Sequence, residues 1–330
     1  MHGPAAAEHV PHPGEPLRKP YLCSLLIPTK NGGDLFKDAV RGLQSQTCWD
    51  EVEFIVVDSG SDDDTVATAK AAGANCISIP PADFNHGATR DFGVAMARCS
   101  RVVLMVQDAV PDDPHMIARL IAALDEDKVA GVYARQIPRP TADVVTKRNL
   151  NTHFTGRQHR QTQVLADPQA YAAMTPEEKR AVCNFDNVCS AIRKDVWALE
   201  HFGRADFGED IAWAERVLKR GYKITYEPAA AVIHSHDRPL SYEYARAYLC
   251  HRVLYRQFGL EQVPTLWSAL LAWGYASLTD IVTILRDERN PAAMLKMLFK
   301  TPLVNFFLIR AKYAAEKHEK LGLPVDGRGV

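Results

Sequence analysis

Val56-Val57-Asp58-Ser59-Gly60-Ser61-Asp62 ends an apolar stretch, turns at a glycine and begins a helical pattern. The apolar residues predict a buried strand over 53–58, and the acidic run 62–64 is typical of a first helical turn, with Ser61 as its expected N-cap. A carboxylate at the carboxyl tip of a strand can accept hydrogen bonds from a base or a ribose. Asp58, with Ser59 beside it, is therefore a candidate nucleotide ligand, whereas 62–64 need no catalytic role.

The same strand–turn–helix arrangement recurs on both sides of this stretch. We expect strands at 23–29, 53–58, 76–80 and 102–108, and helices at 34–46, 62–73, 86–98 and 114–127. Continuous apolar strands between helices indicate an α/β protein with a mostly parallel sheet covered on both faces. Ligands of such sheets bind beyond the carboxyl ends of the strands. Three of these ends are polar: Thr29-Lys30-Asn31, Asp58-Ser59-Gly60 and Gln107-Asp108.

Composition narrows the class of protein. The chain has 330 residues, 47% hydrophobic and 24% charged, and a formal net charge of −1, which suits one large or two modest soluble domains. Near-neutral charge argues against a nucleic-acid partner bound through a broad basic face. The seven cysteines form no CxxC pair and indicate reduced thiols in a cytosolic protein. The sequence contains neither GxGxxG nor GxxxxGK[ST], which disfavours a nicotinamide-binding domain and a P-loop kinase.

The segment Phe84-Asn85-His86-Gly87-Ala88-Thr89-Arg90 begins a predicted helix. Free backbone N–H groups and the positive end of the helix dipole suit an anion there. Arg90 adds a fork of donors for a phosphate or a base edge. The alternative is structural, with Asn85 as the helix cap and Arg90 in solvent.

Val106-Gln107-Asp108-Ala109 places one carboxylate after an apolar strand. One carboxylate, one imidazole and diphosphate oxygens together suit Mg²⁺ or Mn²⁺. Alternatively, Asp108 is a turn residue ahead of Pro111.

A second acidic cluster lies at Gly208-Glu209-Asp210, followed by His234-Ser235-His236. Apolar residues at helical spacing after Asp210 predict a helix whose first turn carries both acids. The two histidines alternate with Val232 and are expected on one face of a strand. The alternative is an acidic helix start and two surface histidines.

The remaining segments differ in character. Residues 138–179 are polar and irregular, as expected of a functional loop. A strand at 187–192 and helices at 195–201 and 241–258 are also expected.

Residues 266–285 are almost wholly apolar, although Asp280 and Gly274 disfavour a membrane span. Residues 286–320 hold eight Lys or Arg and four acids. Apolar helices with this excess of positive charge suit attachment to an anionic membrane surface. Packing on the chain's own domain or on a second subunit in a homodimer is the alternative.

Together these segments resemble the inverting glycosyltransferases of family 2, which have the GT-A fold. The resemblance covers about 23–236 and rests on the order and spacing of five motifs: Ile27-Pro28-Thr29-Lys30-Asn31, Val57-Asp58-Ser59-Gly60-Ser61-Asp62, His86-Gly87-Ala88-Thr89-Arg90, Gln107-Asp108-Ala109 and Gly208-Glu209-Asp210. The His-Gly-x-Thr-Arg, Gln-Asp-Ala and His-Ser-His motifs look most like bacterial rhamnosyltransferases of polysaccharide assembly. One departure is clear, because the usual Asp-x-Asp is Gln107-Asp108-Ala109 here and retains a single carboxylate.

The resemblance implies roles for these residues. Asp210 would be the base that deprotonates the acceptor hydroxyl, and Glu209 would support it, or the two roles would be reversed. A Mg²⁺ or Mn²⁺ ion would lie at Asp108, with His234 favoured over His236 as its second ligand. The residues expected to bind the nucleotide sugar are Pro28, Thr29, Lys30, Asn31, Asp58, Ser59, His86, Gly87, Arg90, Gln107 and Asp108.

The resemblance also implies an organisation and a function. We expect a disordered tail at 1–20, a GT-A domain at 21–240 with a nucleotide-binding half (21–137) and an acceptor half (138–240), and a helical extension at 241–330. The expected enzyme transfers L-rhamnose from dTDP-rhamnose to a glycan or lipid-linked glycan, in the cytoplasm and peripherally at the inner face of the plasma membrane. Two alternatives stay open: a family 2 enzyme using a UDP- or GDP-sugar, and a non-catalytic GT-A scaffold.

Overall fold

A nine-stranded sheet runs through the protein in the order β3-β2-β1-β4-β8-β6-β9-β5, with β7 paired to β9. The structure, a computed structural model, describes residues 21–165, 167–236 and 238–324. The expected tail at 1–20 lies outside the described residues. The strands are β1 (Cys23–Thr29), β2 (Val52–Asp58), β3 (Asn75–Ser78), β4 (Arg101–Met105), β5 (Val110–Pro111), β6 (Val129–Ile137), β7 (Gln161–Gln163), β8 (Cys189–Arg193) and β9 (Lys223–Ile233).

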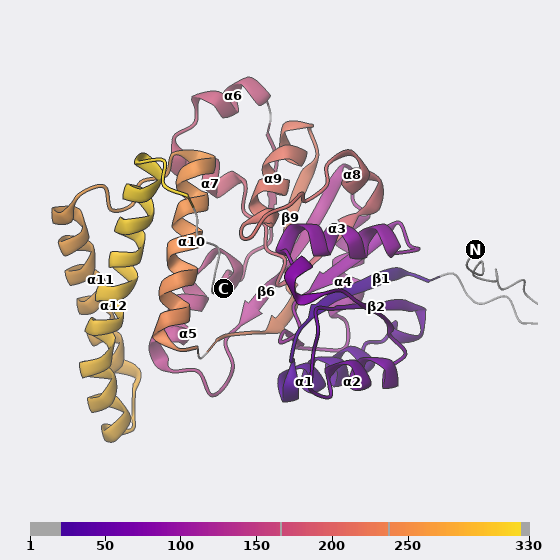
Figure 1. Cartoon of the computed structure of the whole chain (residues 1–330), viewed down its shortest axis with the longest axis horizontal. Helices are drawn as coiled ribbons and strands as arrows, with labels where there is room; N and C mark the ends of the chain where they lie inside the picture. Colours follow the sequence, from indigo (N-terminus) through magenta and orange to yellow (C-terminus); the bar gives the residue numbers. More distant parts are fainter. Residues whose placement is uncertain (1–20, 166, 237, 325–330) are drawn as a thin grey trace, which may run out of the picture.

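Helices cover both faces of this sheet (Figure 1). They are α1 (Gly33–Gln44), α2 (Thr65–Ala71), α3 (His86–Met96), α4 (Met116–Leu124), α5 (Val144–Thr152), α6 (Pro168–Ala173), α7 (Pro176–Val182), α8 (Lys194–Leu199), α9 (Glu209–Lys219), α10 (Leu240–Phe258), α11 (Leu266–Asp287) and α12 (Pro291–Lys320). Three short 3-10 helices are η1 (Trp49–Glu51), η2 (Pro81–Asp83) and η3 (Phe154–Gly156).

The alternation of side chains along β1 divides the core between the two faces. Leu25 and Ile27 belong to the same buried cluster as Phe36 of α1. Leu26 points to the other cluster, with Val94 of α3 and Trp213 of α9. Both faces of the strand are therefore apolar, as the continuous hydrophobic run predicts.

The sheet is parallel in its first half and mixed in its second. β3, β2, β1 and β4 pair in parallel, which confirms the expected parallel sheet in this part of the chain. β8 then pairs antiparallel with both β4 and β6, whereas β6 and β9 run parallel. The carboxyl end of β4 consequently lies beside the start of β8, and this junction holds the site described below.

Three local predictions were wrong. Helix α2 begins at Thr65, and Ser61 does not cap it, because the Ser61 hydroxyl donates instead to Asp58. The segment 138–179 is not irregular and contains α5, η3, β7, α6 and part of α7. His234 and His236 lie beyond the end of β9 rather than alternating along it, which frees both rings to turn toward one point.

The last three helices form a layer beside the second half of the sheet. α12 lies between α10 and α11, and α11 also contacts α5 (Figure 1). Asp280 is buried in this layer, where it pairs with Arg148 of α5 and accepts a hydrogen bond from Asn305 at 2.7 Å. By length and composition, α11 and α12 are each apolar enough to cross a membrane. The division of the chain at residue 240 stays a prediction.

Candidate active site

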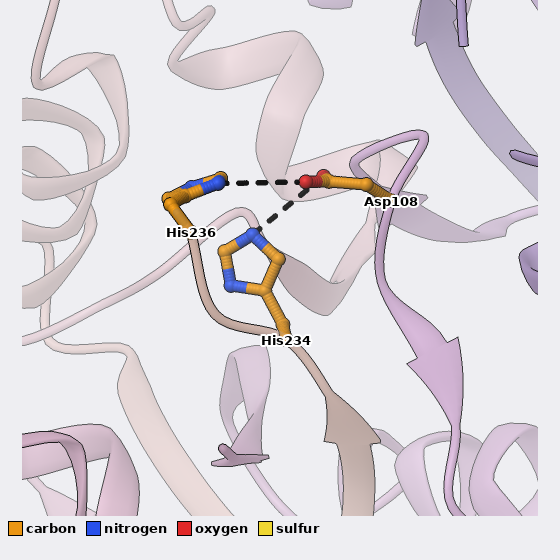
Figure 2. Close-up of side chains that lie close together, drawn as sticks. All are labelled: Asp108, His234 and His236. Atoms are coloured by element: carbon orange, nitrogen blue, oxygen red, sulfur yellow. Dashed lines mark ion pairs between the residues drawn. The ribbon is translucent and has the colours of Figure 1, made fainter. Parts of the chain in front are cut away.

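Asp108, His234 and His236 converge on one point (Figure 2). Asp108 lies in the turn after β4, and both histidines follow the end of β9. Asp108 Oδ1 is 3.6 Å from His234 Nε2, and Asp108 Oδ2 is 3.5 Å from His236 Nδ1. One oxygen and two nitrogens from these residues lie within 4.8 Å of one another. The structure therefore brings His236 to the predicted Asp108–His234 pair.

The donor atoms of this cluster fit a divalent cation. Asp108 Oδ2 and His234 Nε2 are buried and have no hydrogen-bond partner among the described residues. Such atoms are costly unless a ligand compensates them. Carboxylate oxygen and neutral imidazole nitrogen suit Mn²⁺, and Mg²⁺ would use the carboxylate and diphosphate oxygens.

The electrostatics of the cluster keep its ligands in the required protonation states. Burial opposes ionisation of Asp108, but the neighbouring His234, then the charges of His236 and Arg139, lower its pKa to about 2. Burial, followed by the charge of His234, lowers the pKa of His236 to about 4. Asp108 is thus ionised and His236 neutral at pH 7, as metal coordination requires.

Arg139 ties the two ligand-bearing segments together. Its guanidinium donates to the carbonyl oxygen of Asp108 and, at 3.3 Å, to that of Ser235. Its backbone N–H also donates to the Ser235 hydroxyl at 3.1 Å. The position of Asp108 relative to the histidine loop is therefore fixed by an arginine that is not itself a ligand.

Gln107 occupies the place of the missing first carboxylate and has a different role. Its Oε1 accepts from the Lys30 N–H at 2.9 Å, and its Nε2 donates to the Lys30 carbonyl at 3.0 Å. A carboxylate could not make the second bond, because it has no N–H to donate. Gln107 therefore holds the loop after β1 next to Asp108.

The second acidic cluster lies at the start of α9, after Gly208 in a left-handed conformation (φ 75°). Glu209 is buried and forms an ion pair with Arg90 of α3, 2.9 Å from Nη1 to Oε1. Asn187 Nδ2 also donates to Glu209, at 3.2 Å. Glu209 is thus held in place by two partners, and its supporting role stays a prediction.

Asp210 is half-buried and accepts few hydrogen bonds. Its donors are its neighbour Ile211 N–H at 2.7 Å and the Asn187 N–H at 3.4 Å. Burial, followed by the charges of Glu209 and Asp186, raises the pKa of Asp210 to about 8. A carboxylate with a raised pKa and a half-open side chain has the properties of a general base.

The segment before β8 connects the two clusters. Asn187 donates to both acids of α9, and Asp186 accepts from Gln136, which contacts His234. The sequence placed Asp108 and Asp210 a hundred residues apart, and the fold gathers both around 186–187.

The predicted nucleotide ligands near β1 and β2 hold each other in place. The Asp58 carboxylate accepts from the Thr29 hydroxyl at 3.0 Å and from the N–H groups of Gly60 and Ser61. Asn31 (φ 47°) accepts from the Asp62 N–H at 2.9 Å. The Ser59 hydroxyl donates to the Thr29 carbonyl, Lys30 is exposed and Pro28 is half-buried. Contact of these residues with a nucleotide stays a prediction.

The His-Gly-x-Thr-Arg motif joins the two halves of the fold. A Cβ on Gly87 would lie 1.9 Å from the carbonyl oxygen of Gly203, so only glycine allows this approach. Asn85 caps α3 by accepting from Ala88 N–H at 3.1 Å. Arg90 is buried against Glu209 rather than solvated, and burial lowers the pKa of His86. A nucleotide contact by His86, Gly87 or Arg90 stays a prediction.

A sheet that is parallel in its first half and mixed in its second, with acidic clusters at the junction, is the arrangement of a GT-A fold. The chain belongs to Glycosyl transferase family 2, whose model matches residues 24–197. It is therefore a glycosyltransferase.

Two curated relatives agree with this assignment, and a solved structure shares the fold. The chain is 28% identical over 246 residues to the O-antigen chain rhamnosyltransferase RfbN of Salmonella typhimurium (strain LT2), covering 72% of this chain and 75% of the relative. It is 29% identical over 250 residues to the O-antigen chain rhamnosyltransferase WbaN of Salmonella anatum, with the same coverage. The mannosyltransferase PcManGT of Pyrobaculum calidifontis, solved with GDP-Man and Mn²⁺, is similar in fold, with a TM-score of 0.52 at 16% identity over 95% of this chain and 81% of that one.

Gln136, Asp186 and Asn187 were not predicted from the sequence as parts of the site. Gln136 interrupts an apolar strand, and the Asp186-Asn187 pair directly precedes another one. A polar residue inside a buried strand, and a polar pair at a strand start, were the available signals.

Proposed function

We propose that this glycosyltransferase moves L-rhamnose from dTDP-rhamnose to a glycan or lipid-linked glycan acceptor, with inversion at the anomeric carbon. The two Salmonella relatives are O-antigen chain rhamnosyltransferases, which supports the sugar and the polysaccharide context. The observation that carries the catalytic part is the convergence of the Asp108 and Asp210 clusters on 186–187.

Asp210 removes the proton from the acceptor hydroxyl as its oxygen attacks the anomeric carbon. The bond from that carbon to the donor's diphosphate breaks, and the nucleoside diphosphate leaves with the electron pair. Glu209, held by Arg90, keeps a negative charge beside Asp210 and thereby increases its basicity.

The Asp108, His234 and His236 cluster would hold Mg²⁺ or Mn²⁺. When bound, this ion would neutralise charge on the diphosphate. The residues themselves keep the carboxylate ionised and the His236 imidazole neutral, and Arg139 fixes the distance between the two loops.

The alternatives make different demands on the same site. A UDP- or GDP-sugar donor would need the same acidic clusters and different contacts with its nucleobase. PcManGT was solved with GDP-Man, and glucosyl-3-phosphoglycerate synthase of Mycobacterium tuberculosis was solved with UDP-glucose. A non-catalytic scaffold would need neither an ionised Asp108 nor a basic Asp210.

We place the enzyme in the cytoplasm, at the inner membrane surface, through α11 and α12. Large apolar side chains are exposed along one stripe of each helix: Trp267, Leu271, Tyr275, Leu278, Val282 and Leu285 on α11, and Leu295, Phe299, Leu303 and Phe306 on α12. Among the described residues, no carboxylate lies within 4.0 Å of Lys296, Lys300 or Arg310, which are exposed on α12. An apolar stripe with such cations beside it suits binding to an anionic lipid surface. The alternative is that the same face forms the interface of a homodimer.

A thermal-shift screen of nucleotide sugars with and without Mn²⁺ tests the donor. We expect dTDP-rhamnose with Mn²⁺ to give the largest stabilisation, because a ligand that binds the native state raises its melting temperature. A larger shift in melting temperature with a UDP- or GDP-sugar would identify that nucleotide sugar as the donor. No shift with any nucleotide sugar would favour the non-catalytic scaffold.

A further inference from the structure

A chain of hydrogen bonds runs from Asp186 through Gln136 to His234. Gln136 Nε2 donates to Asp186 Oδ2 at 2.9 Å, and Gln136 Oε1 lies 2.9 Å from His234 Nδ1. Asp186 Oδ1 accepts the backbone N–H of Val188 at 2.7 Å. His234 is therefore connected to a backbone-anchored carboxylate by one amide side chain.

The order of donors along this chain decides which nitrogen of His234 carries the proton. The Val188 N–H donates to Asp186 Oδ1, and the amide nitrogen of Gln136 donates to Oδ2, so Asp186 accepts at both oxygens. With its amide nitrogen on Asp186, Gln136 presents its oxygen to His234 Nδ1. An amide oxygen only accepts, so the proton of neutral His234 lies on Nδ1.

This tautomer leaves a lone pair on His234 Nε2, the nitrogen that faces Asp108. Nε2 is buried, lies 3.6 Å from Asp108 Oδ1 and has no hydrogen-bond partner among the described residues. With Gln136 turned the other way, its N–H would face Nδ1 and the proton would move to Nε2. A proton there would occupy the position that a cation needs.

We propose that Gln136, oriented by Asp186, is a positioning residue that holds His234 as the Nδ1–H tautomer and so presents Nε2 to a divalent cation beside Asp108. The role of the cation rests on the proposed function, whereas the tautomer does not. Partners that fix the orientation and basicity of a ligating histidine typically change metal affinity by about 10- to 100-fold when removed.

The fold keeps this arrangement rigid. Gln136 is buried on β6, opposite Val232 of β9, two residues before His234. The pairing of β6 with β9 therefore sets the distance from the amide to the imidazole. Asp186 is held in turn by the start of β8, which pairs with β6.

The test compares Gln136→Met, which removes both hydrogen bonds at similar volume, with Gln163→Met. Gln163 is an equally buried amide that donates to the carbonyls of Val182 and Asn184, and it has no bond to the metal cluster. The full chain, labelled with ¹⁵N-histidine, gives the tautomer of His234 by NMR, and His234→Gln identifies its signals. Titration with Mn²⁺ alone gives the metal affinity.

We expect wild-type His234 to be the Nδ1–H tautomer, and Gln136→Met to lose this preference and bind Mn²⁺ about 10- to 100-fold more weakly. Gln163→Met should change neither. A wild-type Nε2–H tautomer, or an unchanged tautomer in folded Gln136→Met, overturns the proposal. If Mn²⁺ fails to bind the wild type while the Nδ1–H tautomer is present, the metal part of the proposed function is wrong and the positioning role of Gln136 stands.

Discussion

Arg90 of α3 and Glu209 of α9 form a buried ion pair, with 2.9 Å between Nη1 and Oε1 and side chains only 6% and 7% exposed. The pair connects the helix that begins with His86 to the acidic start of α9. Arg90 also donates to the His86 carbonyl at 3.1 Å. The start of α9, where Glu209 precedes Asp210, is therefore joined to α3 by one buried charged contact.

Glu209→Gln should strongly destabilise the protein. The substitution leaves the guanidinium of Arg90 buried without its counter-charge, which typically costs about 3–5 kcal/mol. Denaturant unfolding measures this loss. The control is Asp125→Asn, which breaks the half-exposed pair with Arg101 and should cost about 1 kcal/mol or less. Similar losses in both variants would mean that the Arg90–Glu209 contact is not buried in solution.

Asp210→Asn should abolish transfer and leave binding of the nucleotide sugar largely intact. The amide cannot accept the acceptor's proton, whereas the donor contacts lie elsewhere. The same variant should be at least as stable as the wild type at pH 7.5. Burial and the charge of Glu209 disfavour the ionised form of Asp210, and the substitution removes this cost. Transfer assays, donor titration and thermal unfolding measure the three effects.

Asp62→Asn is the matched control for Asp210→Asn, since Asp62 is exposed and has no catalytic role in the proposed function. It should leave all three measurements unchanged. If Asp210→Asn retained transfer activity, Asp210 would be excluded as the general base, and Glu209 would be favoured in that role.

The pH profile should rise through the neutral range. The base must be ionised to accept a proton, and the pKa of Asp210 is raised to about 8 by burial, Glu209 and Asp186. Below that pH, kcat/KM should therefore fall about tenfold per pH unit. Glu209→Gln should move the midpoint to lower pH, because it removes the nearest negative charge. A profile that is flat between pH 6 and about 8 would contradict the raised pKa.

The parts of this site that the sequence predicted lie at strand ends and helix starts. Asp108 follows an apolar run and Asp210 begins an amphipathic helix, so local pattern was sufficient to select them. The contacts that define their roles join distant segments: Gln107 with Lys30, Arg90 with Glu209, and Gln136 with Asp186. No local pattern encodes such pairs, because they depend on the sheet order.

The sheet order also explains the errors. A polar stretch between Pro138 and Lys179 indicates a loop by composition, yet its Gln161–Gln163 strand forms because β9 offers a free edge. His234 and His236 match a strand's alternation, but the pairing of β9 ends at Ile233. In both cases the neighbouring strand decided the conformation, as is usual for β-structure.

Asp108→Ala should weaken binding of dTDP in the presence of Mn²⁺ or Mg²⁺ and leave thymidine binding unchanged. The carboxylate is the anionic ligand of the cluster, and thymidine has no phosphate to reach the ion. Calorimetric titration with and without chelator measures both effects. Asp112→Ala, which removes an exposed carboxylate close by in the sequence, should behave as the wild type. Equal wild-type affinity for dTDP with and without chelator would exclude a role for the metal in donor binding.

The C-terminal face should bind anionic vesicles. Tyr275 on α11 is 76% exposed, and Phe299 on α12 is 77% exposed. α12 also carries the exposed Lys296 and Lys300, which have no carboxylate within 4.0 Å among the described residues. Tyr275→Ser with Phe299→Ser should reduce flotation with phosphatidylglycerol-containing vesicles, since burial of each ring in the interface is lost. Lys296→Gln with Lys300→Gln should reduce flotation more at low salt than at high salt, because salt already screens the charge attraction at high salt.

Leu199→Ser, which removes an exposed apolar side chain from α8, is the control and should leave flotation unchanged. Wild-type protein that does not float, but sediments as a dimer that Tyr275→Ser with Phe299→Ser dissociates, would assign this face to a second copy of the chain.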